Sequence, residues 1–320
     1  MQASELKIGI FLPNWTAALD GETPSAAEIV QFAQYCEQTG FDTVWLADHF
    51  YFEPYDDYRV IGVQFPDELA GVKFGSWECW SLMSAIAVAT SSVGIGTLVS
   101  NTGFRNPALF ARVVATVDDL SEGRVILGLG AGDFATEHRA FGFPFERRVS
   151  RFEEALAIIK PLLRGERVSF DGEFYQAHEA ELLPKAGRAG GPAVLIGTLM
   201  GGPRMSRLVA QQADMWNCNL AFGDSGPEAY LAAWAPIAHA CEKHGRDPES
   251  LVRHATVGVN LGDGPFSAPG SAPFCGSITD IADRFRAYAA LDVEHISIVL
   301  EPATYASLDR FGDVLAQLRG

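Results

Sequence analysis

The feature that most constrains the fold is an alternation of short apolar runs and longer amphipathic runs along the whole chain. The apolar runs are predicted strands at residues 6–12, 43–47, 93–99, 125–129, 193–197, 215–217, 255–261 and 295–300. A helix is predicted after each of them, at residues 25–38, 77–89, 107–120, 151–163, 203–212, 227–244, 278–290 and 305–318. Continuous apolar strands joined by helices are typical of a parallel sheet whose outer face is covered.

Eight strand–helix units in 320 residues predict an α/β fold, the (β/α)8 TIM barrel, with residues 1–320 forming a single domain. The alternative is a doubly wound open sheet, but no G-x-G-x-x-G follows the first strand. Three segments depart from the repeat and are predicted insertions after strands two, four and seven: residues 51–76, 165–192 and 262–276. The second insertion reads as a β-hairpin that turns at Asp171 and Gly172.

Charge and composition narrow the partners that we expect. The net charge is 24 − 40 = −16, which disfavours nucleic acid because its binding depends on neutralising phosphates. We expect no membrane partner, since no apolar run reaches the roughly 18 residues of a membrane span. The N-terminal segment leads directly into a strand, so we expect no signal peptide. Five scattered cysteines indicate free thiols in a reducing cytoplasm.

Two titratable residues follow the second predicted strand in the stretch VWLADHFYF. The strand ends with Asp48 and His49, and aromatic residues follow directly. In a barrel, the carboxyl ends of the strands form the rim at which ligands bind. The pair therefore predicts a functional site, although a hydrogen-bonded pair that only fixes the loop remains an alternative.

A second candidate site follows the fifth predicted strand. Gly201 and Gly202 lead into a helix that opens at Pro203, a first-turn position that suits proline. Glycines allow backbone amides to approach a ligand, and a helix N-terminus favours an anion. The stretch predicts a phosphate site to which Arg204 adds a charge. The alternative is that the two glycines only form the turn.

The fourth predicted strand ends in a glycine pattern, Gly128, Gly130 and Gly132, followed by Asp133. Glycines at a strand end leave room for a flat ligand against the backbone. Glu137 and His138 come shortly afterwards. These three titratable residues lack a usual zinc spacing, so no metal is predicted.

Together these stretches resemble the luciferase-like monooxygenase family, the bacterial luciferase superfamily of FMN and deazaflavin F420 enzymes. The resemblance extends from KIGIFLP to HISIVLEP. Four segments carry it: GFDTVWLADHF; VATSSVGIGTLVSNTGFRNPALFARVVATVDDLSEGRVILGLGAG; EHRAFGFPFERRVSRFEEALAIIKPLL followed by FDGEFYQ; and GGPRMSRLVAQQADMWN. It implies a (β/α)8 barrel, a homodimer and a cofactor ring in the barrel mouth.

The resemblance also implies roles for single residues. His49, with Asp48 beside it, would be catalytic next to the cofactor ring. A non-proline cis peptide would lie within residues 97–100. The cofactor-binding residues would be Thr97, Leu98, Val99, Ser100, Ala131, Gly132, Asp133, Glu137, His138, Gly197, Thr198, Gly201, Gly202, Pro203 and Arg204. The substrate pocket would include Trp15, Tyr51, Phe52 and Asn101.

Two chemistries fit this resemblance. In the preferred one, a monooxygenase takes reduced FMN from a separate flavin reductase and uses O2 to oxygenate a small organic substrate. In the alternative, an F420-dependent dehydrogenase or reductase transfers hydride without O2. FMN is preferred because F420 carries a polyglutamate tail, and this acidic chain has five lysines; Arg59, Arg105, Arg139 and Arg204 are the cations available to that tail. A non-catalytic flavin-binding barrel is a further alternative. An aldolase-type barrel is disfavoured, since no lysine ends a predicted strand.

Overall fold

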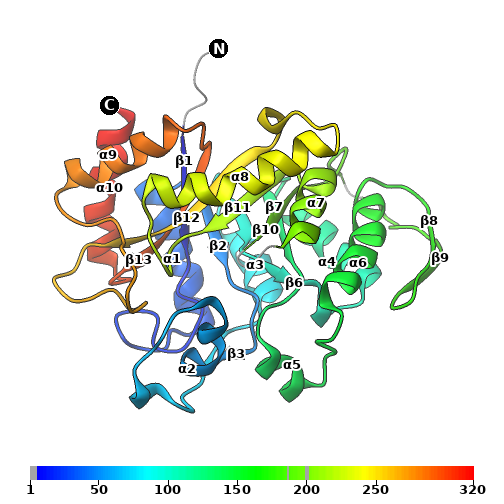
Figure 1. The fold of residues 1–320 in the computed structure, drawn as a ribbon, viewed down its shortest axis with the longest axis horizontal. Helices are drawn as coiled ribbons and strands as arrows, with labels where there is room; N and C mark the ends of the chain where they lie inside the picture. The colour runs from blue at the N-terminus through cyan, green and yellow to red at the C-terminus, as the bar shows by residue number, and fades with distance from the viewer. Residues whose placement is uncertain (1–5, 186, 199–201) are drawn as a thin grey trace.

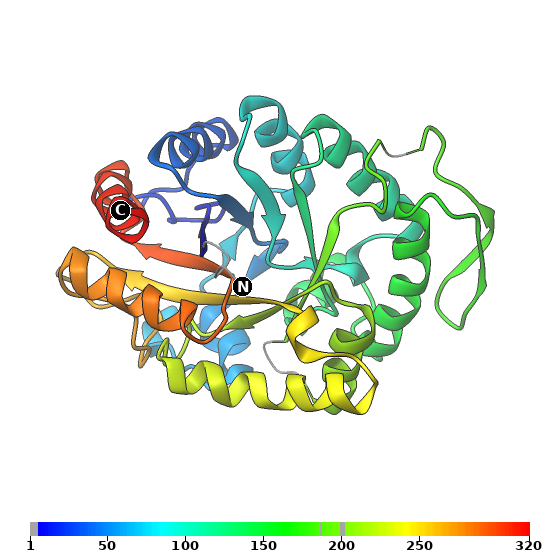
Figure 2. The same ribbon diagram turned by 90° about the horizontal axis from the view of Figure 1, so that it is seen from above.

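Eight parallel strands form a closed barrel in the computed structural model, which describes residues 6–185, 187–198 and 202–320. The neighbours run in the order β1, β2, β5, β7, β10, β11, β12 and β13, and β13 pairs with β1 to close the ring (Figure 2). The strands are β1 Lys7–Phe11, β2 Thr43–Leu46, β5 Gly94–Thr97, β7 Val125–Gly130, β10 Ala193–Gly197, β11 Met215–Asn219, β12 Val252–Asn260 and β13 His295–Glu301. The predicted TIM barrel is confirmed.

Helices surround the barrel, as Figure 2 shows in the view along its axis. They are α1 Ala26–Thr39, α3 Cys79–Ala89, α4 Pro107–Leu120, α6 Arg148–Leu163, α7 Pro203–Gln212, α8 Pro227–Lys243, α9 Ile278–Ala289 and α10 Tyr305–Arg319. The sequence signals act as expected at α1: Ser25 and Glu28 form a capping box, and Gly40 takes φ 97° at the C-terminal end. Helix α6 begins three residues before the predicted start.

The main hydrophobic core lies between the strands and the helices. Fully buried residues of β1 such as Ile8 and Ile10 pack in one cluster with helix residues such as Phe32 and Phe311. A second, smaller cluster contains Trp45, and it also includes Leu98 and Val99. The barrel is therefore filled with side chains below the site.

Strand three ends earlier than the sequence predicts. β5 stops at Thr97, a cis peptide joins Leu98 to Val99, and the chain then pairs with β7 as β6, Ser100–Asn101. The cis peptide lies within the predicted interval of residues 97–100.

This bend explains the glycines of strand four. A Cβ at Gly128 would lie 1.8 Å from the Thr97 carbonyl oxygen, and one at Gly130 would lie 2.5 Å from Val99 Cγ2. The prediction that these glycines leave room for a ligand is corrected at Gly128, because the chain of strand three fills the space beside it.

The three insertions depart from the repeat as predicted. Residues 51–76 form a short antiparallel pair, β3 Tyr51–Phe52 and β4 Phe74–Gly75, with α2 Pro54–Asp57, η1 Tyr58–Ile61 and η2 Asp67–Leu69 between them, at the bottom of Figure 1. The second insertion contains the hairpin β8 Val168–Asp171 and β9 Gln176–Ala180. The third returns to β12 through a bridge between Val259 and Phe274.

Three further elements were not predicted: α5 Ala135–Phe141 after β7, η3 Thr102–Phe104 and η4 Pro248–Ser250. α5 lies beside the first insertion at the lower end of the barrel in Figure 1. Within the described ranges, no helix has the length and the apolar character that would let it cross a membrane.

Candidate active site

A cavity of about 1000 Å³ opens at the carboxyl ends of the strands. His49 and Gly202 both line it, so the two sites predicted from separate stretches belong to one cavity. Of the predicted site residues, those that line it are Trp15, Asp48, His49, Phe52, Leu98, Val99, Asn101, Ala131, Gly132, Asp133, Gly197, Thr198, Gly202, Pro203 and Arg204.

The remaining predicted site residues do not line this cavity. Thr97, Ser100, Glu137 and His138 are fully buried behind its wall, and Tyr51 lies outside the lining. Gly201 falls outside the described residues. The expectation that Glu137 and His138 face the cofactor is therefore corrected: these side chains act from behind the cavity wall.

His49 is held by a buried carboxylate. Its Nδ1 lies 2.7 Å from Oε1 of Glu137, which is fully buried and on α5. The other oxygen of Glu137 accepts a hydrogen bond of 2.8 Å from the backbone N–H of Phe50. The ring of Phe134 stacks on the imidazole with a centroid distance of 5.0 Å. These contacts fix the ring, and among the described residues no hydrogen bond engages Nε2.

The charges around His49 set its protonation state. Burial lowers the pKa of His49, but the hydrogen bond to Glu137 and the negative charges of Glu137, Asp133 and Asp48 outweigh burial and raise the pKa to about 9. The imidazole is therefore a cation at neutral pH. With Nδ1 engaged by Glu137, Nε2 is the nitrogen left to exchange a proton with a ligand.

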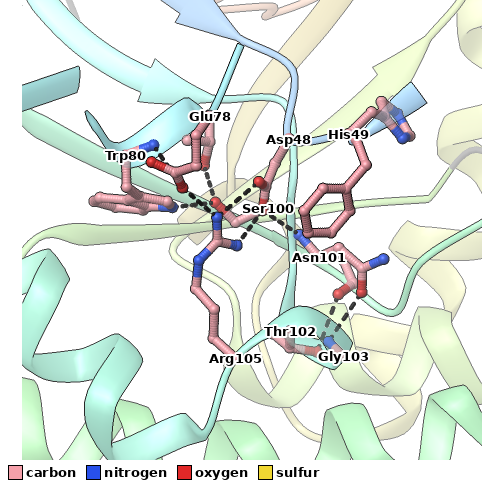
Figure 3. A network of polar contacts seen from close by, with 12 residues as sticks. Asp48, His49, Glu78, Trp80, Ser100, Asn101, Thr102, Gly103 and Arg105 are labelled. Carbon is pink, nitrogen blue, oxygen red and sulfur yellow. Dashed lines mark hydrogen bonds and ion pairs between the residues drawn. The ribbon is translucent and has the colours of Figure 1, made fainter. Parts of the chain in front are cut away.

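Asp48 is turned away from this chemistry. Both of its oxygens accept hydrogen bonds from Arg105, at 2.6 and 2.9 Å, and Oδ2 also accepts one from the Asn101 backbone. Arg105 in turn pairs with Glu78 at 2.7 Å. Figure 3 shows the carboxylate facing this network while the His49 ring points away from it. Asp48 is thus a positioning residue: its hydrogen bonds hold the end of β2 against the chain that follows β5.

His138 supports the cavity wall in a neutral form. Burial lowers its pKa, and its Nδ1 lies 3.0 Å from the Pro144 carbonyl oxygen, to which it donates. Its Nε2 then accepts from the Asn101 side-chain amide at 2.8 Å. The Oδ1 of the same Asn101 amide accepts a hydrogen bond from the backbone N–H of Gly103. This arrangement holds Asn101 at the cavity surface.

The start of α7 has the properties of an anion site. Gly202 is its N-cap without any side-chain cap, and no hydrogen bond within the described residues uses the N–H of Gly202 or Arg204. A Cβ at Gly202 would meet no atom within 4 Å, so the space before the helix is open. Arg204 bonds to Ser150 and Glu153, and Arg148 also lines the cavity.

Phe134, Phe222 and Glu301 line the cavity but were not among the residues predicted for the site. Tyr58, Phe134 and Phe222 form an aromatic cluster beside His49, with Tyr58 in contact with the other two rings. Glu301 ends β13, and a polar residue at a strand exit is the same signal that pointed to Asp48. Arg105 was predicted only as a cation available to a cofactor tail. Its pairing with Asp48, 57 residues away, is not indicated by any local sequence pattern.

The site is thus a TIM-barrel rim at which a carboxylate-bound histidine and an open helix start line one cavity. The chain belongs to the luciferase-like monooxygenase family, whose model matches residues 6–294, and it is an oxidoreductase.

The relatives and solved structures that the chain resembles are named as oxidoreductases, several of them F420-dependent. The chain is 30% identical over 286 residues to the F420-dependent glucose-6-phosphate dehydrogenase of Kineococcus radiotolerans, covering 88% of this chain and 74% of that protein. It is 30% identical over 224 residues to the 5,10-methylenetetrahydromethanopterin reductase of Methanolobus tindarius, covering 70% of this chain and 58% of that protein. The solved structure of an F420-dependent secondary alcohol dehydrogenase with an F420-acetone adduct superposes with a TM-score of 0.76, at 18% identity over 99% of this chain and 100% of that one.

Proposed function

We propose that the protein is an F420-dependent oxidoreductase in which His49 supplies the proton that accompanies hydride transfer to a substrate carbonyl. The observation that carries the proposal is that His49, held from behind by Glu137, faces the same cavity as the open start of α7. The printed names of relatives that are F420-dependent glucose-6-phosphate dehydrogenases support F420 over FMN and reverse the preference drawn from the acidic composition.

The residues of the cavity fit such a cofactor. The phosphate would meet the free N–H groups of Gly202 and Arg204, where the missing Cβ of Gly202 leaves open space. The ring system would lie against Leu98, Val99 and Gly132. A volume of about 1000 Å³ is at the upper end of ordinary ligand sites, so it leaves room for a substrate beside the cofactor.

When bound, the deazaflavin would exchange a hydride, which is one proton with two electrons, with a substrate carbon. The chain handles the second proton. Cationic His49 donates from Nε2 to the carbonyl oxygen, which yields the alcohol, and solvent then reprotonates the imidazole. Glu137 keeps the ring oriented and cationic, so at neutral pH this site favours proton donation. Alcohol oxidation requires the neutral imidazole and is favoured as the pH approaches 9.

Cofactor titrations test the proposal. Purified protein is titrated with F420 and with FMN while the cofactor fluorescence is followed, and we expect F420 to bind at least 10-fold more tightly. Gly202→Asp should weaken binding by placing a carboxylate in the phosphate space, whereas the neutral Gly202→Asn is the matched control for size. Equal affinities of the Asp and Asn variants would place the phosphate elsewhere.

The second candidate is an FMN-dependent monooxygenase supplied by a separate flavin reductase. The net charge of −16 favours it, because the F420 tail is itself anionic. Oxygen consumption with reduced FMN and substrate separates the two candidates: the proposed function predicts no oxygen uptake above background. The homodimer and the cytoplasmic location remain predictions.

A further inference from the structure

The cavity has two unlike ends. Around the start of α7 it is lined by Arg148, Arg204 and backbone N–H groups that no other described residue accepts from. The opposite end, which we call the substrate end, consists of three acidic residues, Asp20, Asp263 and Glu301, together with the aromatic wall described next. The acidic residues come from loops that are bonded to one another: the N–H of Asp20 donates to Ala303, and Ser267 donates to Glu301.

An aromatic wall connects the substrate end to His49. It consists of the lining aromatic residues Trp15, Phe52, Tyr58, Phe65, Phe74, Phe134 and Phe222. Phe52 stacks on Phe74 with a centroid distance of 5.6 Å, and Tyr58 contacts Phe65, Phe134 and Phe222 at 4.9–5.4 Å. The segment of residues 51–76 is joined to the first loop by the bridge between Trp15 and Ser76. A substrate carbonyl near His49 would therefore have aromatic carbon as its closest surroundings.

Apart from the imidazole of His49, the positively charged side chains of the described lining lie at the other end of the cavity. Among the described residues, Arg148 and Arg204 are the only lysine or arginine side chains that line it, and residues 1–5, 186 and 199–201 contain neither type. Arg59 and Lys73 belong to the 51–76 segment but are not part of the lining, and Lys73 pairs with Glu53 at 3.2 Å. A phosphate group needs charged donors of this kind for tight recognition.

From this division we infer that the substrate is an uncharged, mainly apolar ketone or the corresponding alcohol. This inference rests on the proposed function. Phosphorylated sugars and other anions are excluded as substrates. The apolar part lies on the aromatic wall and the oxygen faces His49. The three carboxylates repel an anion at the substrate end, where the described lining contains no lysine or arginine to offset them. This differs from the substrate in the name of the glucose-6-phosphate dehydrogenase relative.

A matched pair of aryl ketones tests the inference. Acetophenone and 4-acetylphenyl phosphate share the reducible carbonyl and differ by one phosphate group. We expect acetophenone to bind the protein saturated with oxidised F420, in which the cofactor phosphate occupies the start of α7, about 100-fold more tightly than the phosphate ester, as measured by calorimetry. The same ratio is expected in kcat/KM with reduced F420. Equal or tighter binding of the phosphate ester would overturn the inference.

Two variants sharpen the test. Asp20→Lys combined with Asp263→Lys changes two exposed carboxylates into cations and should narrow the difference between the two ketones at least 10-fold. Phe65→Ala should weaken acetophenone binding, whereas Tyr55→Ala, on the same segment but outside the lining, should not. If neither change has its effect, the substrate binds elsewhere. Acetophenone binding without turnover would keep the inference and count against the proposed function.

Discussion

Histidines occur in two contrasting regions of the barrel. At the rim, His49 is surrounded by carboxylates, which raise its pKa to about 9. In the interior, burial lowers the pKa of His295 to about 3 and also lowers the pKa of His254. The ring centroids of these two histidines lie 4.8 Å apart. Both environments are largely closed to solvent, so partner charge rather than burial decides the protonation state. The rim histidine is therefore the proposed proton donor, whereas the interior pair is neutral and packed in the core.

The largest effect that we expect comes from removing the rim histidine. His49→Ala should lower turnover at least 10²-fold, because no other group in the described cavity takes over proton donation in this geometry. The dissociation constant of F420 should change little. Steady-state rates and fluorescence titration check both parts. Unchanged turnover would show that His49 is a structural residue. The rim and interior histidines would then not differ in function.

Removing an interior histidine should affect stability instead. His295→Ala should lower the free energy of unfolding by about 2–4 kcal/mol, since it leaves a cavity and deprives Thr43 of a hydrogen bond of 2.8 Å. Denaturant unfolding measures this loss. Turnover at a temperature where the variant is folded should stay within about twofold. A large fall in turnover in the folded variant would show that the interior region takes part in the reaction.

The carboxylate that distinguishes the two regions can be neutralised. In Glu137→Gln, burial dominates and the pKa of His49 falls, so the alkaline limb of the reduction rate, expected near pH 9 in the native protein, should move toward acid by at least one pH unit. The pH profile of kcat/KM measures the shift. Asp263→Asn is the control, because it removes a cavity carboxylate that is not a cause of the pKa shift of His49. An unmoved limb in Glu137→Gln would mean that another group titrates.

The smallest effect is the dependence of stability on pH. Because its pKa is raised in the folded state, His49 contributes fully to the free energy of unfolding below about pH 6.5, and this contribution is lost as the pH rises through about 9. A lowered pKa has the opposite sign: between about pH 6.5 and 3, the unfolded chain binds more protons at His295, so stability falls with the pH. When the free energy of unfolding in urea is measured across pH, His49→Gln should flatten its alkaline limb and His295→Gln its acid limb.

The fold could be predicted from the sequence because each strand and helix carries its own local pattern. The capping box at Ser25 and the apolar run ending at Asp48 define their elements without reference to distant residues. The location of the site followed from the rule that barrel ligands bind at strand exits. The same rule would also have pointed to Glu301.

The roles within the site could not be predicted in this way. Asp48 and His49 are neighbours, yet one faces Arg105 and the other Glu137, and both partners lie more than 50 residues away. The glycines of strand four were assigned to a ligand because nothing local indicates that strand three bends toward them. Long-range partners decide which polar side chain faces the cavity, and single-sequence patterns do not contain them.

The titration of His49 itself tests the central claim most directly. With histidine labelled by 15N, the imidazole resonances of His49, assigned by comparison with His49→Gln, are followed by NMR from pH 5 to 10. We predict a midpoint near pH 9 that moves toward acid in Glu137→Gln. A midpoint at or below 6.5 in the native protein would contradict the assignment of His49 as a cationic proton donor.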